Sequence, residues 1–438
     1  MRAYVGMHIA TGLKGIREMD DIWSSQKYFR DSDLAGVMPR NRYWALNRYV
    51  HIVDDSTVIT DRTQPGYDPL YKVRNMINLA NTRFAEIYKP GQHLSVDESM
   101  VKFDGRHMSK QYMPKKPIKW GFKFWMLAEA SSGYCLRVEM YEGKLRGAAR
   151  NAIVKSHGLG YDVVDTLTKE YQQKNHIVYY DRFFSSVKLA EDLLSKATYT
   201  NSTVMLNRQG LPAAMKRLKL KKGAACRQKQ KGQLLLTVFI DKRQVSHLST
   251  GIAPGLVQNS LKPIVNEDYN AHMGGVDLAD QHKSYYSVGR KARRWWKYIM
   301  WYIFTLSIKN AHLVRQASNI TGLSAADRSK HLKQTHKQFR RDLVELLIDG
   351  YEGRHRVVGT GFKRVIPACA VMSPAAAITH ICELAAEQRV CFYCARKGDK
   401  APKGGSIRTK GWCSQCMKHL CPVGCFSRYH LELCTPAP

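Results

Sequence analysis

Acidic residues are scarce in this sequence. Its 438 residues contain 36 Asp and Glu against 69 Lys and Arg, which gives a formal net charge of +33 at pH 7. A folded chain with this excess of positive charge indicates a polyanionic partner. Nucleic acid is the first candidate and an anionic membrane surface is the second. The charge balance alone does not distinguish them.

Long apolar runs are also missing. No stretch of about 18 uncharged apolar residues occurs, so the sequence offers no candidate membrane-spanning helix. The residues after Met1 are too poor in apolar side chains for a secretory signal. Hydrophobic residues still make up 44% of the chain, which suffices for real cores and excludes global disorder. The length is enough for roughly two to four domains.

The cysteines are concentrated at the C-terminus, where seven of the eleven lie within the last 48 residues. Two C-x-x-C pairs have the spacing of tetrahedral zinc ligands. With one histidine they form eight ligands, enough for two structural Zn²⁺ ions: Cys391, Cys394, Cys413, Cys416, Cys421, Cys425, His430 and Cys434. A disulfide knot is the alternative, and it is disfavoured because nothing signals secretion.

We favour an interleaved zinc pairing. The first and third pairs would hold one ion, and the second and fourth pairs the other. Such a cross-braced pair of zinc ions stabilises a segment that is too small to bury its own hydrophobic core. His419 is a rival to His430, and spacing does not decide between them. The first ion would be held by Cys391, Cys394, Cys421 and Cys425, and the second by Cys413, Cys416, His430 and Cys434.

Four aspartates lie at the ends of predicted strands or on a predicted helix. Alternating apolar residues predict a strand that ends in acid at Asp97, and a buried strand over residues 177–180 ends at Asp181. A helix lies between the two strands, so a right-handed crossover would lay them parallel and close. Asp277 and Asp280 share one helix face at i,i+3.

Converging carboxylates repel one another, and a pair of divalent ions would remove that cost. Two Mg²⁺ or Mn²⁺ ions can clamp the attacking and leaving oxygens of a phosphodiester, as in nucleases, polymerases and transposases. Each aspartate also has an ordinary structural explanation. Asp97 would be a surface strand residue, Asp181 the start of a turn, and Asp277 a helix N-cap.

Three ordered blocks surround these acids. Val96-Asp97-Glu98-Ser99-Met100 begins the first, which continues to Lys119-Trp120-Gly121. Tyr180-Asp181-Arg182-Phe183-Phe184 begins the second, and His272-Met273-Gly274-Gly275-Val276-Asp277 lies in the third. Together with the terminal cysteines, the blocks resemble the piggyBac-type transposases over nearly the whole chain, from about residue 3 to 434.

The resemblance implies a DDE/D enzyme with an RNase H-like core in an α/β fold. Asp97, Asp181 and Asp277 would be the catalytic triad and Asp280 a fourth, supporting acid. The family excises an element at its ends through hairpin intermediates and inserts it at TTAA targets. For this chain the resemblance implies a nuclear homodimer on DNA, acting on transposon terminal repeats, with two catalytic ions and two zinc ions. Chromatin proteins are possible further partners.

The same resemblance gives a domain plan. A helical dimerisation and DNA-binding domain is expected to be truncated at its N-terminus and split by a core, which is itself interrupted by a basic β-rich insertion. The segments are 1–90 (helical domain, first part), 91–205 (core, first part), 206–262 (insertion), 263–285 (core helix with the third acid), 286–350 (helical domain, second part), 351–388 (linker) and 389–438 (zinc domain).

Two departures from the family pattern bear on activity. The family usually has Asn after the second aspartate, where this chain has Arg182. A guanidinium there would weaken cation binding or pair with a phosphate. The upstream acidic segment of the relatives is also missing, which puts dimer assembly in doubt. Both departures favour an alternative, a catalytically silent, domesticated DNA-binding protein, and a third possibility is a chromatin adaptor that uses its zinc module.

Basic clusters mark the expected DNA contacts. One follows the first acidic strand, a second is a run of eight Lys and Arg between residues 216 and 231, and a third precedes an aromatic helix over residues 295–304. Aromatic side chains of that helix are expected to belong to the core rather than to stack on bases. The contacts we single out are Lys115, Lys116, Lys119, Lys216, Arg217, Lys219, Lys221, Lys222, Arg290, Lys291, Arg293 and Arg294. Sequence readout is assigned to the zinc module.

Overall fold

The computed structural model describes residues 1–61, 63–114, 116–143, 148–221, 224–289, 291–318, 329, 332–349, 351, 380, 382–401 and 404–434. The chain divides into two units, Met1–Arg354 and His355–Pro438. Within the described residues, no helix has the length and apolarity needed to cross a bilayer.

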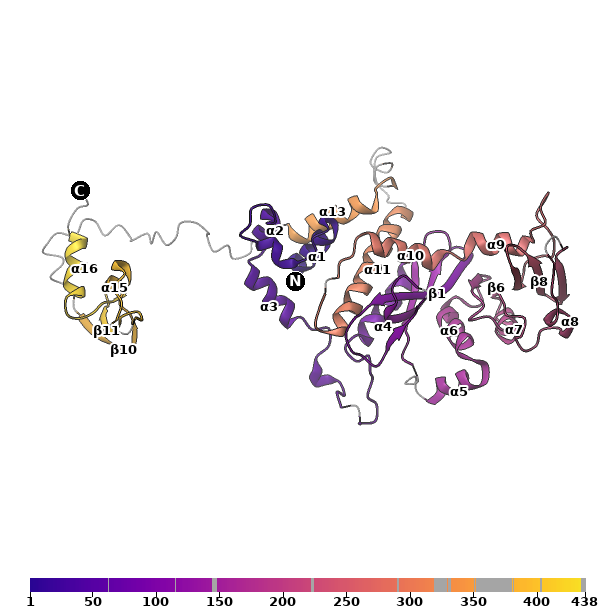
Figure 1. Cartoon of the computed structure of the whole chain (residues 1–438), viewed down its shortest axis with the longest axis horizontal. Coiled ribbons are helices and arrows are strands. Elements are labelled where there is room, and N and C mark those ends of the chain that lie inside the picture. Colours follow the sequence, from indigo (N-terminus) through magenta and orange to yellow (C-terminus); the bar gives the residue numbers. More distant parts are fainter. Residues whose placement is uncertain are drawn as a thin grey trace. The chain divides into compact units, whose positions relative to one another are not determined.

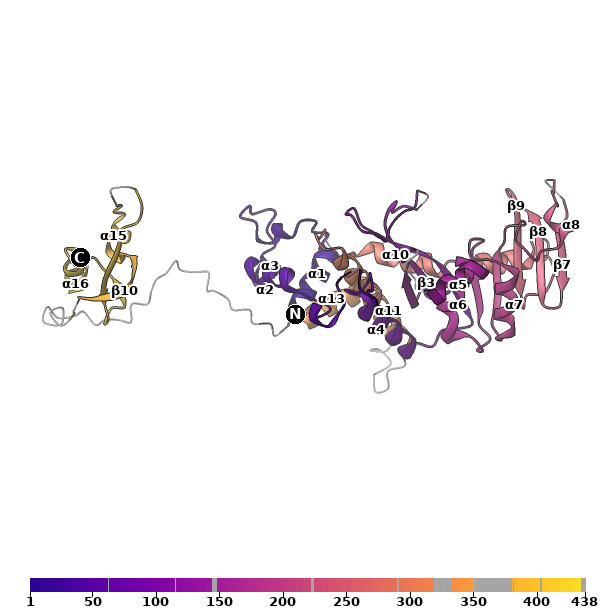
Figure 2. The same ribbon diagram turned by 90° about the horizontal axis from the view of Figure 1, so that it is seen from below.

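The first unit is built on one mixed sheet (Figures 1 and 2). Its strand order is β2-β3-β1-β5-β6-β9-β8-β7, with β4 also paired to β3. Strands β1, β5 and β6 run parallel, whereas β3 is antiparallel to β1 and β4. The strands are β1 (His93–Lys102), β2 (Lys110–Tyr112), β3 (Trp120–Glu129), β4 (Cys135–Met140), β5 (Ile177–Tyr180), β6 (Tyr199–Thr203), β7 (Arg227–Lys231), β8 (Leu234–Ile240) and β9 (Gln244–Thr250).

Helices precede, cover and follow this sheet. The amphipathic stretch from Tyr71 to Tyr88 forms α4, and the aromatic segment that begins at Trp295 opens the long helix α11, as predicted. The first and last helices of the unit, α1 and α13, pack together. The helices are α1 (Arg2–Lys14), α2 (Ser32–Val37), α3 (Arg40–Tyr49), α4 (Arg74–Ile87), α5 (Ala148–His157), α6 (Leu159–Thr168), α7 (Val187–Ser195), α8 (Ala213–Lys216), α9 (Ile264–His272), α10 (Gly275–Tyr285), α11 (Trp295–Ala317) and α13 (His336–Ile348).

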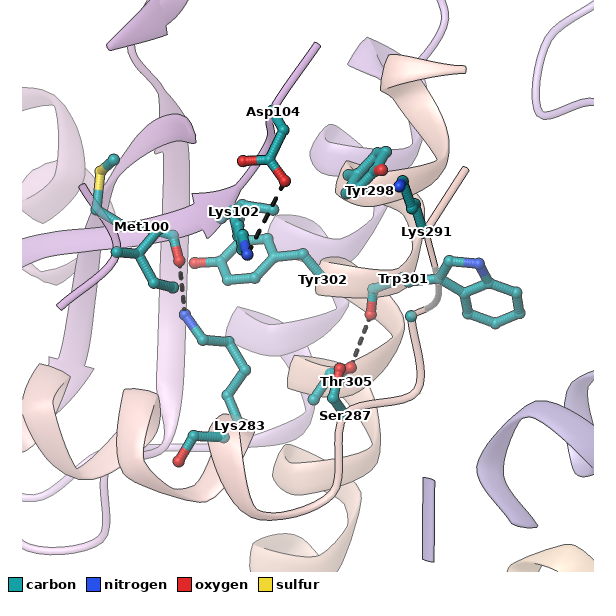
Figure 3. Close-up of a pocket in the computed structure, with 14 residues that line it drawn as sticks. Met100, Lys102, Asp104, Lys283, Ser287, Lys291, Tyr298, Trp301, Tyr302 and Thr305 are labelled. Atoms are coloured by element: carbon teal, nitrogen blue, oxygen red, sulfur yellow. Dashed lines mark hydrogen bonds and ion pairs between the residues drawn. The ribbon is translucent and has the colours of Figure 1, made fainter. Parts of the chain in front are cut away.

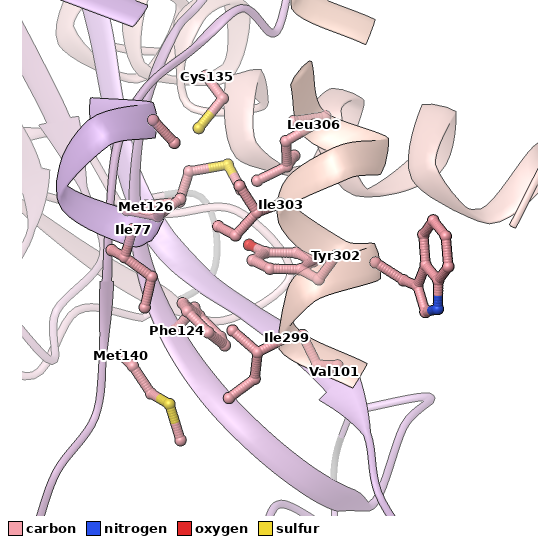
Figure 4. Close-up of a cluster of buried hydrophobic side chains, with 14 of the residues drawn as sticks. Ile77, Val101, Phe124, Met126, Cys135, Met140, Ile299, Tyr302, Ile303 and Leu306 are labelled. Carbon is pink, nitrogen blue, oxygen red and sulfur yellow. The ribbon is translucent and has the colours of Figure 1, made fainter. Parts of the chain in front are cut away.

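The main core lies between one face of the sheet and the helices α4 and α11. Phe124 and Met126 of β3 point from the sheet toward Ile299 and Tyr302 of α11 (Figure 4). Trp296, Trp301 and Tyr302 are each no more than 5% exposed. The prediction that the aromatic side chains of this helix belong mainly to the core is therefore confirmed. On the opposite face, α6 contacts β3 and β4.

The β-rich segment over residues 206–262 continues the same sheet. Strand β9 pairs antiparallel with β6, and β8 and β7 follow it outward. A small cluster of buried side chains packs β8 and β9 against α7. The sheet thus runs without interruption from the acidic strands into the basic segment.

The second unit is small and has its own three-stranded sheet, ordered β10-β11-β12. Its first strand begins at Cys382, inside the segment 351–388 that was expected to be a linker. Of that expected linker, residues 352–379 and 381 lie outside the described part of the chain. The elements are β10 (Cys382–Val390), α15 (Phe392–Lys397), β11 (Arg408–Cys413), β12 (Lys418–His419) and α16 (Cys425–Cys434).

Candidate active site and metal centres

Asp97 and Asp181 lie beside each other on neighbouring parallel strands. Val96 of β1 is in register with Tyr180 of β5, so the next residues of the two strands, Asp97 and Asp181, are adjacent. Strand β5 ends at Tyr180, as predicted. The expectation that the first strand also ends in acid is wrong, because β1 continues through Asp97 to Lys102. Asp97 pairs with Met126 of β3, one residue beyond the last pair between β1 and β5.

Helix α10 brings the other two acids over the sheet. It packs against β1 and β3 and carries Asp277 in its first turn. Its first residue is Gly275, where a Cβ would lie 2.5 Å from Ser95 Oγ and 2.6 Å from the Glu129 carbonyl oxygen. Only glycine permits this close approach of helix to sheet. The N-cap of α10 is Gly274, so Asp277 does not serve as its N-cap.

Asp280 is held by two partners. Its Oδ1 accepts a hydrogen bond of 2.5 Å from Ser99 Oγ and one of 2.8 Å from Lys283 Nζ. Lys283 also donates to the Met100 carbonyl oxygen at 3.1 Å. These bonds tie the end of α10 to β1. Asp280 therefore fixes the helix that carries Asp277, which suits a supporting acid.

Lys116 is the cation nearest the acids. Its Nζ lies 3.6 Å from Asp97 Oδ2 and 3.8 Å from Glu98 Oε2. Burial lowers the pKa of Lys116, but nearby carboxylates, among them those of Asp277 and Asp280, outweigh burial and raise it. One lysine thus experiences the charge of acids from β1 and from α10, which shows that the two elements converge.

Burial disfavours the ionised form of two of the carboxyl groups, those of Asp97 and Asp181. Burial raises the pKa of Asp97 to about 6, and the charges of Glu98 and Asp181 add to the effect, while Lys116 opposes it. Burial also raises the pKa of Asp181. A group of acids whose pKa values are raised by burial and by one another is typical of a functional site.

These residues fit divalent cations. The oxygen-rich donor set is the one Mg²⁺ and Mn²⁺ prefer, and a bound cation would remove the repulsion that raises the carboxyl pKa values. The oxygen atoms of Asp97, Asp181 and Asp277 do not all lie within 4.8 Å of one another. Closing this donor set around an ion therefore requires side-chain movement.

Glu98 and Lys123 are participants that sequence reasoning did not single out. They form an ion pair of 2.8 Å on the face of the sheet opposite Asp97. Lys123 Nζ lies 3.7 Å from the ring centre of Trp125, which stacks on Phe183. In the sequence, the pair could have been recognised because Lys123 lies in an apolar strand, diagonally opposite Glu98 on the neighbouring strand. The pair links the first acidic strand to the loop after Asp181.

A cavity of about 400 Å³ lies beside Lys283, the lysine that holds Asp280. Figure 3 shows Lys283 reaching across it to Met100, with Lys102 and Lys291 among the residues that line it. Tyr298 and Tyr302 of α11 contribute aromatic walls. Three lysines and three aromatic residues line this cavity together with Asp104, and cations beside aromatic rings are suited to nucleic acid.

A second, more basic cavity of about 680 Å³ lies between α3 and the segment before α11. It brings the predicted DNA contacts Lys291, Arg293 and Arg294 together with Arg40 and Arg48 of α3. The two arginines of α3 were not singled out from the sequence, because the residues that join them in this surface are more than 240 positions away. Asp20 is the acid that lines the cavity, and it pairs with Arg40 at 2.7 Å.

The remaining predicted DNA contacts divide into two groups. Lys119 and the basic run that begins in α8 are exposed, and β7 continues the run as an exposed edge strand. Lys115, Lys222 and Arg290 lie outside the described residues. The exposed members of the run are Lys216, Arg217, Lys219 and Lys221.

The second unit holds two tetrads of cysteine and histidine that can bind zinc. The first contains Cys391, Cys394, Cys421 and Cys425, the four residues that the interleaved pairing grouped. Cys394 Sγ lies 3.3 Å from Cys425 Sγ and 4.0 Å from Cys421 Sγ. Sulfur atoms bound at about 2.3 Å around one zinc ion lie about 3.8 Å apart, so small shifts close this site.

The second tetrad contains His380, Cys413, Cys416 and His430. Cys416 Sγ lies 3.4 Å from His430 Nε2 and 3.4 Å from His380 Nδ1. His430 donates from Nδ1 to the Phe426 carbonyl oxygen at 2.6 Å, which leaves Nε2 free for a metal. His380 is the fourth member of this group among the described residues. The side chain of Cys434, which the spacing placed in this site, lies outside the described residues, so its assignment stays a prediction.

His419, the rival to His430, is in neither tetrad and packs against the ring of Trp412 at 4.8 Å. Sequence spacing missed His380 because the residue lies 11 positions before the first C-x-x-C pair. Strand β10 brings it to Cys413, since Cys382 pairs with Cys413 in the sheet. The chain that forms the zinc unit thus begins earlier than residue 389.

The family model described as Transposase IS4 matches residues 1–312, which is more than half of the chain. This chain therefore belongs to the IS4/piggyBac family of transposases.

Human relatives and a solved structure are consistent with this membership. PiggyBac transposable element-derived protein 3 of Homo sapiens is 24% identical over 336 residues, which cover 71% of this chain and 54% of that protein. PiggyBac transposable element-derived protein 5 of Homo sapiens is 22% identical over 335 residues, with 73% and 63% covered. The chain spans about half to two thirds of the length of these relatives.

One matching structure is a cryo-EM structure of a piggyBac transposase synaptic complex with hairpin DNA. It superposes with a TM-score of 0.70 at 23% sequence identity, and the match covers 96% of this chain and 85% of that one. The similarity shows that the two proteins share a fold.

Proposed function

We propose that this protein is a DNA transposase that cleaves phosphodiester bonds and transfers DNA strands with the help of divalent cations. The observation that carries the proposal is the register of β1 and β5, which sets Asp97 beside Asp181 under the helix that bears Asp277. The strand order β4-β3-β1-β5-β6, antiparallel and then parallel, supports an RNase H-like core.

In this proposal, acidic residues bind the metal ions and basic residues bind the DNA phosphates. Asp97, Asp181 and Asp277 would hold two Mg²⁺ or Mn²⁺ ions, with Asp280 in support. When bound, such ions activate the attacking oxygen and stabilise the leaving oxygen of a phosphodiester. Lys116, 3.6 Å from Asp97, is placed to pair with a DNA phosphate once cations neutralise the acids. The basic cavity beside α3 would position the flanking duplex.

The proposed substrates are the terminal repeats of a transposon and a TTAA target, processed by cut and paste. They follow from the resemblance of the three sequence blocks to piggyBac-type transposases. A homodimer acting in the nucleus, with two structural Zn²⁺ ions in the second unit, completes the proposal. The two tetrads support the zinc requirement.

A second candidate is a domesticated, catalytically silent DNA-binding protein or chromatin adaptor. It is favoured by Arg182, an exposed residue directly after Asp181 whose charge acts on that carboxyl. A fixed cation at this position competes with metal ions for the same carboxylate. Basic surfaces and zinc tetrads serve this function equally well, so only cleavage distinguishes the two.

The deciding experiment is cleavage of a labelled duplex that carries the flanking terminal repeats and TTAA, with Mg²⁺ or Mn²⁺. The transposase predicts metal-dependent nicking that Asp181→Ala abolishes. Asp241→Ala, which removes an exposed acid in the β8–β9 turn, is the matched control and should cleave normally. Salt-sensitive DNA binding without cleavage by the unaltered chain would instead support the domesticated binder.

A further inference from the structure

Two cations in the helices of the first unit are buried without an acidic partner. Lys309 of α11 is 4% exposed and Arg340 of α13 is 0% exposed. Lysine and arginine side chains are almost never fully buried unless they are paired. The charge of Arg340 acts on Lys309 and that of Tyr286 acts on Arg340, and no described carboxylate acts on either cation. The described part of the chain therefore does not balance this positive charge.

The two cations belong to a basic cluster formed by His282, Lys309, His312, His336 and Arg340. Lys309 and His312 share one face of α11 at i,i+3, and His336 and Arg340 share one face of α13 at i,i+4. The rings of His312 and His336 bring these faces together, with their centres 5.1 Å apart. The ring of His282, near the end of α10, lies 6.1 Å from that of His336. Three helices thus place basic side chains at one point.

Three hydrogen-bond donors of the basic cluster are unused. Arg340 donates from Nε to His336 Nε2 at 3.0 Å and from Nη1 to the Tyr286 carbonyl oxygen at 2.8 Å. Its Nη2 is buried and has no hydrogen-bond partner among the described residues. Because His336 accepts at Nε2, its proton is on Nδ1, which is also buried and without a partner in the described part of the chain. The third donor is Lys309 Nζ, which forms no hydrogen bond to a described residue.

The other histidines border these donors. His312 donates from Nε2 to the Gln334 carbonyl oxygen at 3.0 Å, so its Nδ1 is an acceptor and does not bind an anion. His282 and His336 are half-buried. A small ion can therefore enter from solvent on the side of these two rings.

The pKa values reflect the same imbalance. Burial, followed by the charge of Arg340, lowers the pKa of Lys309 to about 8. Burial lowers the pKa of Arg340 to about 10. A buried charge without a partner is costly, and a nearby anion would remove that cost and raise both pKa values.

We propose that Arg340, Lys309 and His336 bind one small inorganic oxyanion of the phosphate class. Guanidinium and ammonium groups suit oxyanions, and a tetrahedral ion offers an acceptor oxygen to each unused donor. A free ion is favoured over a phosphate of duplex DNA because Lys309 and Arg340 are buried. The ion joins α11 to α13, and Arg340 extends the link to the carbonyl of Tyr286, directly after α10. The site would therefore support the helix that carries two of the acids, whatever the catalytic activity of the chain.

The first test compares thermal unfolding of the full chain in phosphate and in chloride at equal ionic strength, followed by tryptophan fluorescence. Phosphate stabilises most proteins by exclusion from their surfaces, so the comparison between variants decides. Phosphate should raise the Tm of the unaltered chain by about 3–5 °C more than that of Lys309→Met. This variant replaces a buried cation with an apolar side chain of similar length and should fold.

Lys337→Met, which removes an exposed lysine of α13, is the matched control for this comparison. It should respond to phosphate as the unaltered chain does. An equal response in all three chains would overturn the proposal.

The second measurement counts the bound ion in the unaltered chain and needs no variant. Equilibrium dialysis with radiolabelled inorganic phosphate, without Mg²⁺ or Mn²⁺, should give one saturable phosphate per chain. Potassium acetate at about 0.3 M screens the exposed basic surfaces. Absence of saturable binding would overturn the proposal, and displacement by an equimolar short duplex would overturn the assignment to a free ion. Neither measurement requires cleavage, so a catalytically silent chain would leave both tests intact.

Discussion

Asp97 and Asp181 are neighbours across two parallel strands, although 84 residues separate them in the sequence. The register that pairs Val96 with Tyr180 fixes this relationship. Asp97 is fixed in mid-strand by its pairing with Met126 of β3, whereas Asp181 begins the loop after β5 and accepts a 2.8 Å hydrogen bond from the Phe183 backbone N–H. Two carboxylates held by neighbouring points of the backbone suit a site that binds cations.

The raised pKa of Asp97 predicts a pH-dependent stability. The folded-state pKa is about 6 against an ordinary value of 3.8, so the native state binds a proton that the unfolded chain has released between these values. This contribution to stability is fully present below pH 3.8 and is lost as pH rises through 6, with a total of about 3 kcal/mol. Asp97→Asn should abolish it.

The measurement is the free energy of unfolding in denaturant at pH 5.0 and 7.5, without added Mg²⁺ or Mn²⁺. The difference between the unaltered chain and Asp97→Asn cancels contributions from zinc and from other groups. A difference that does not change between the two pH values would contradict the assignment.

Lys116 should determine the pH below which the rate of DNA cleavage falls. Its charge lowers the pKa of Asp97, so Lys116→Met should raise that pKa and move the acid limb of the pH–rate profile to higher pH. Loss of a phosphate partner should also slow cleavage about 10- to 100-fold. Lys169→Met, which removes an exposed lysine outside the predicted DNA contacts, is the matched control. Identical profiles for the two variants would exclude this role.

Gly274 and Gly275, at the start of α10, allow a test of how closely this helix packs against the sheet. A Cβ at Gly275 meets Ser95 Oγ at 2.5 Å, whereas a Cβ at Gly274 meets nothing within 4 Å. Gly275→Ala should therefore displace α10, cost about 1–3 kcal/mol of stability and abolish cleavage. Gly274→Ala should stay within about 0.5 kcal/mol. Thermal denaturation and the cleavage assay together check this, and equal effects of the two variants would refute the docking.

Zinc binding in the second unit should depend on His380. His380→Ala removes a ligand of the tetrad completed by Cys413, Cys416 and His430, and should leave the chain with one zinc fewer. Cys382→Ser, two residues further along the chain but outside both tetrads, should keep the full zinc content. Metal analysis of the purified chains is the measurement. Full zinc content in His380→Ala would return the fourth position to Cys434.

The basic cavity beside α3 predicts a specific salt dependence. Arg48 and Arg294 both line it, and each is expected to contact a DNA phosphate. Replacing either with Gln should weaken binding of any duplex and reduce the slope of log K against log salt by about 1. Arg83→Gln, on α4, whose side chain is 65% exposed and paired with Glu86, serves as the control. Unchanged slopes would place the DNA elsewhere.

Local patterns predicted much of this architecture. The strand over residues 177–180 and the helices α4 and α11 follow from apolar periodicity, and the four cysteines of the first tetrad follow from spacing alone. The crossover rule was enough to lay the strands of Asp97 and Asp181 parallel, because helix, strand order and handedness are linked.

The features that the sequence did not predict depend on contacts between residues that are far apart along the chain. Strand β1 continues beyond Asp97 because β3 pairs with it as far as Lys102, which alternation before the acid does not show. His380 reaches its tetrad through strand pairing rather than ligand spacing. Arg40 joins Arg294 in one cavity only after the helices pack.

The most direct test of the central claim is Mn²⁺ binding by the zinc-loaded full chain in the presence of a TTAA-containing duplex, measured by electron paramagnetic resonance. Shared coordination by acids of β1, of the loop after β5 and of α10 predicts that Asp97→Asn, Asp181→Asn and Asp277→Asn each release Mn²⁺ that the unaltered chain holds, while Asp241→Asn does not. Mn²⁺ binding that survives all three substitutions would contradict a metal centre at these acids.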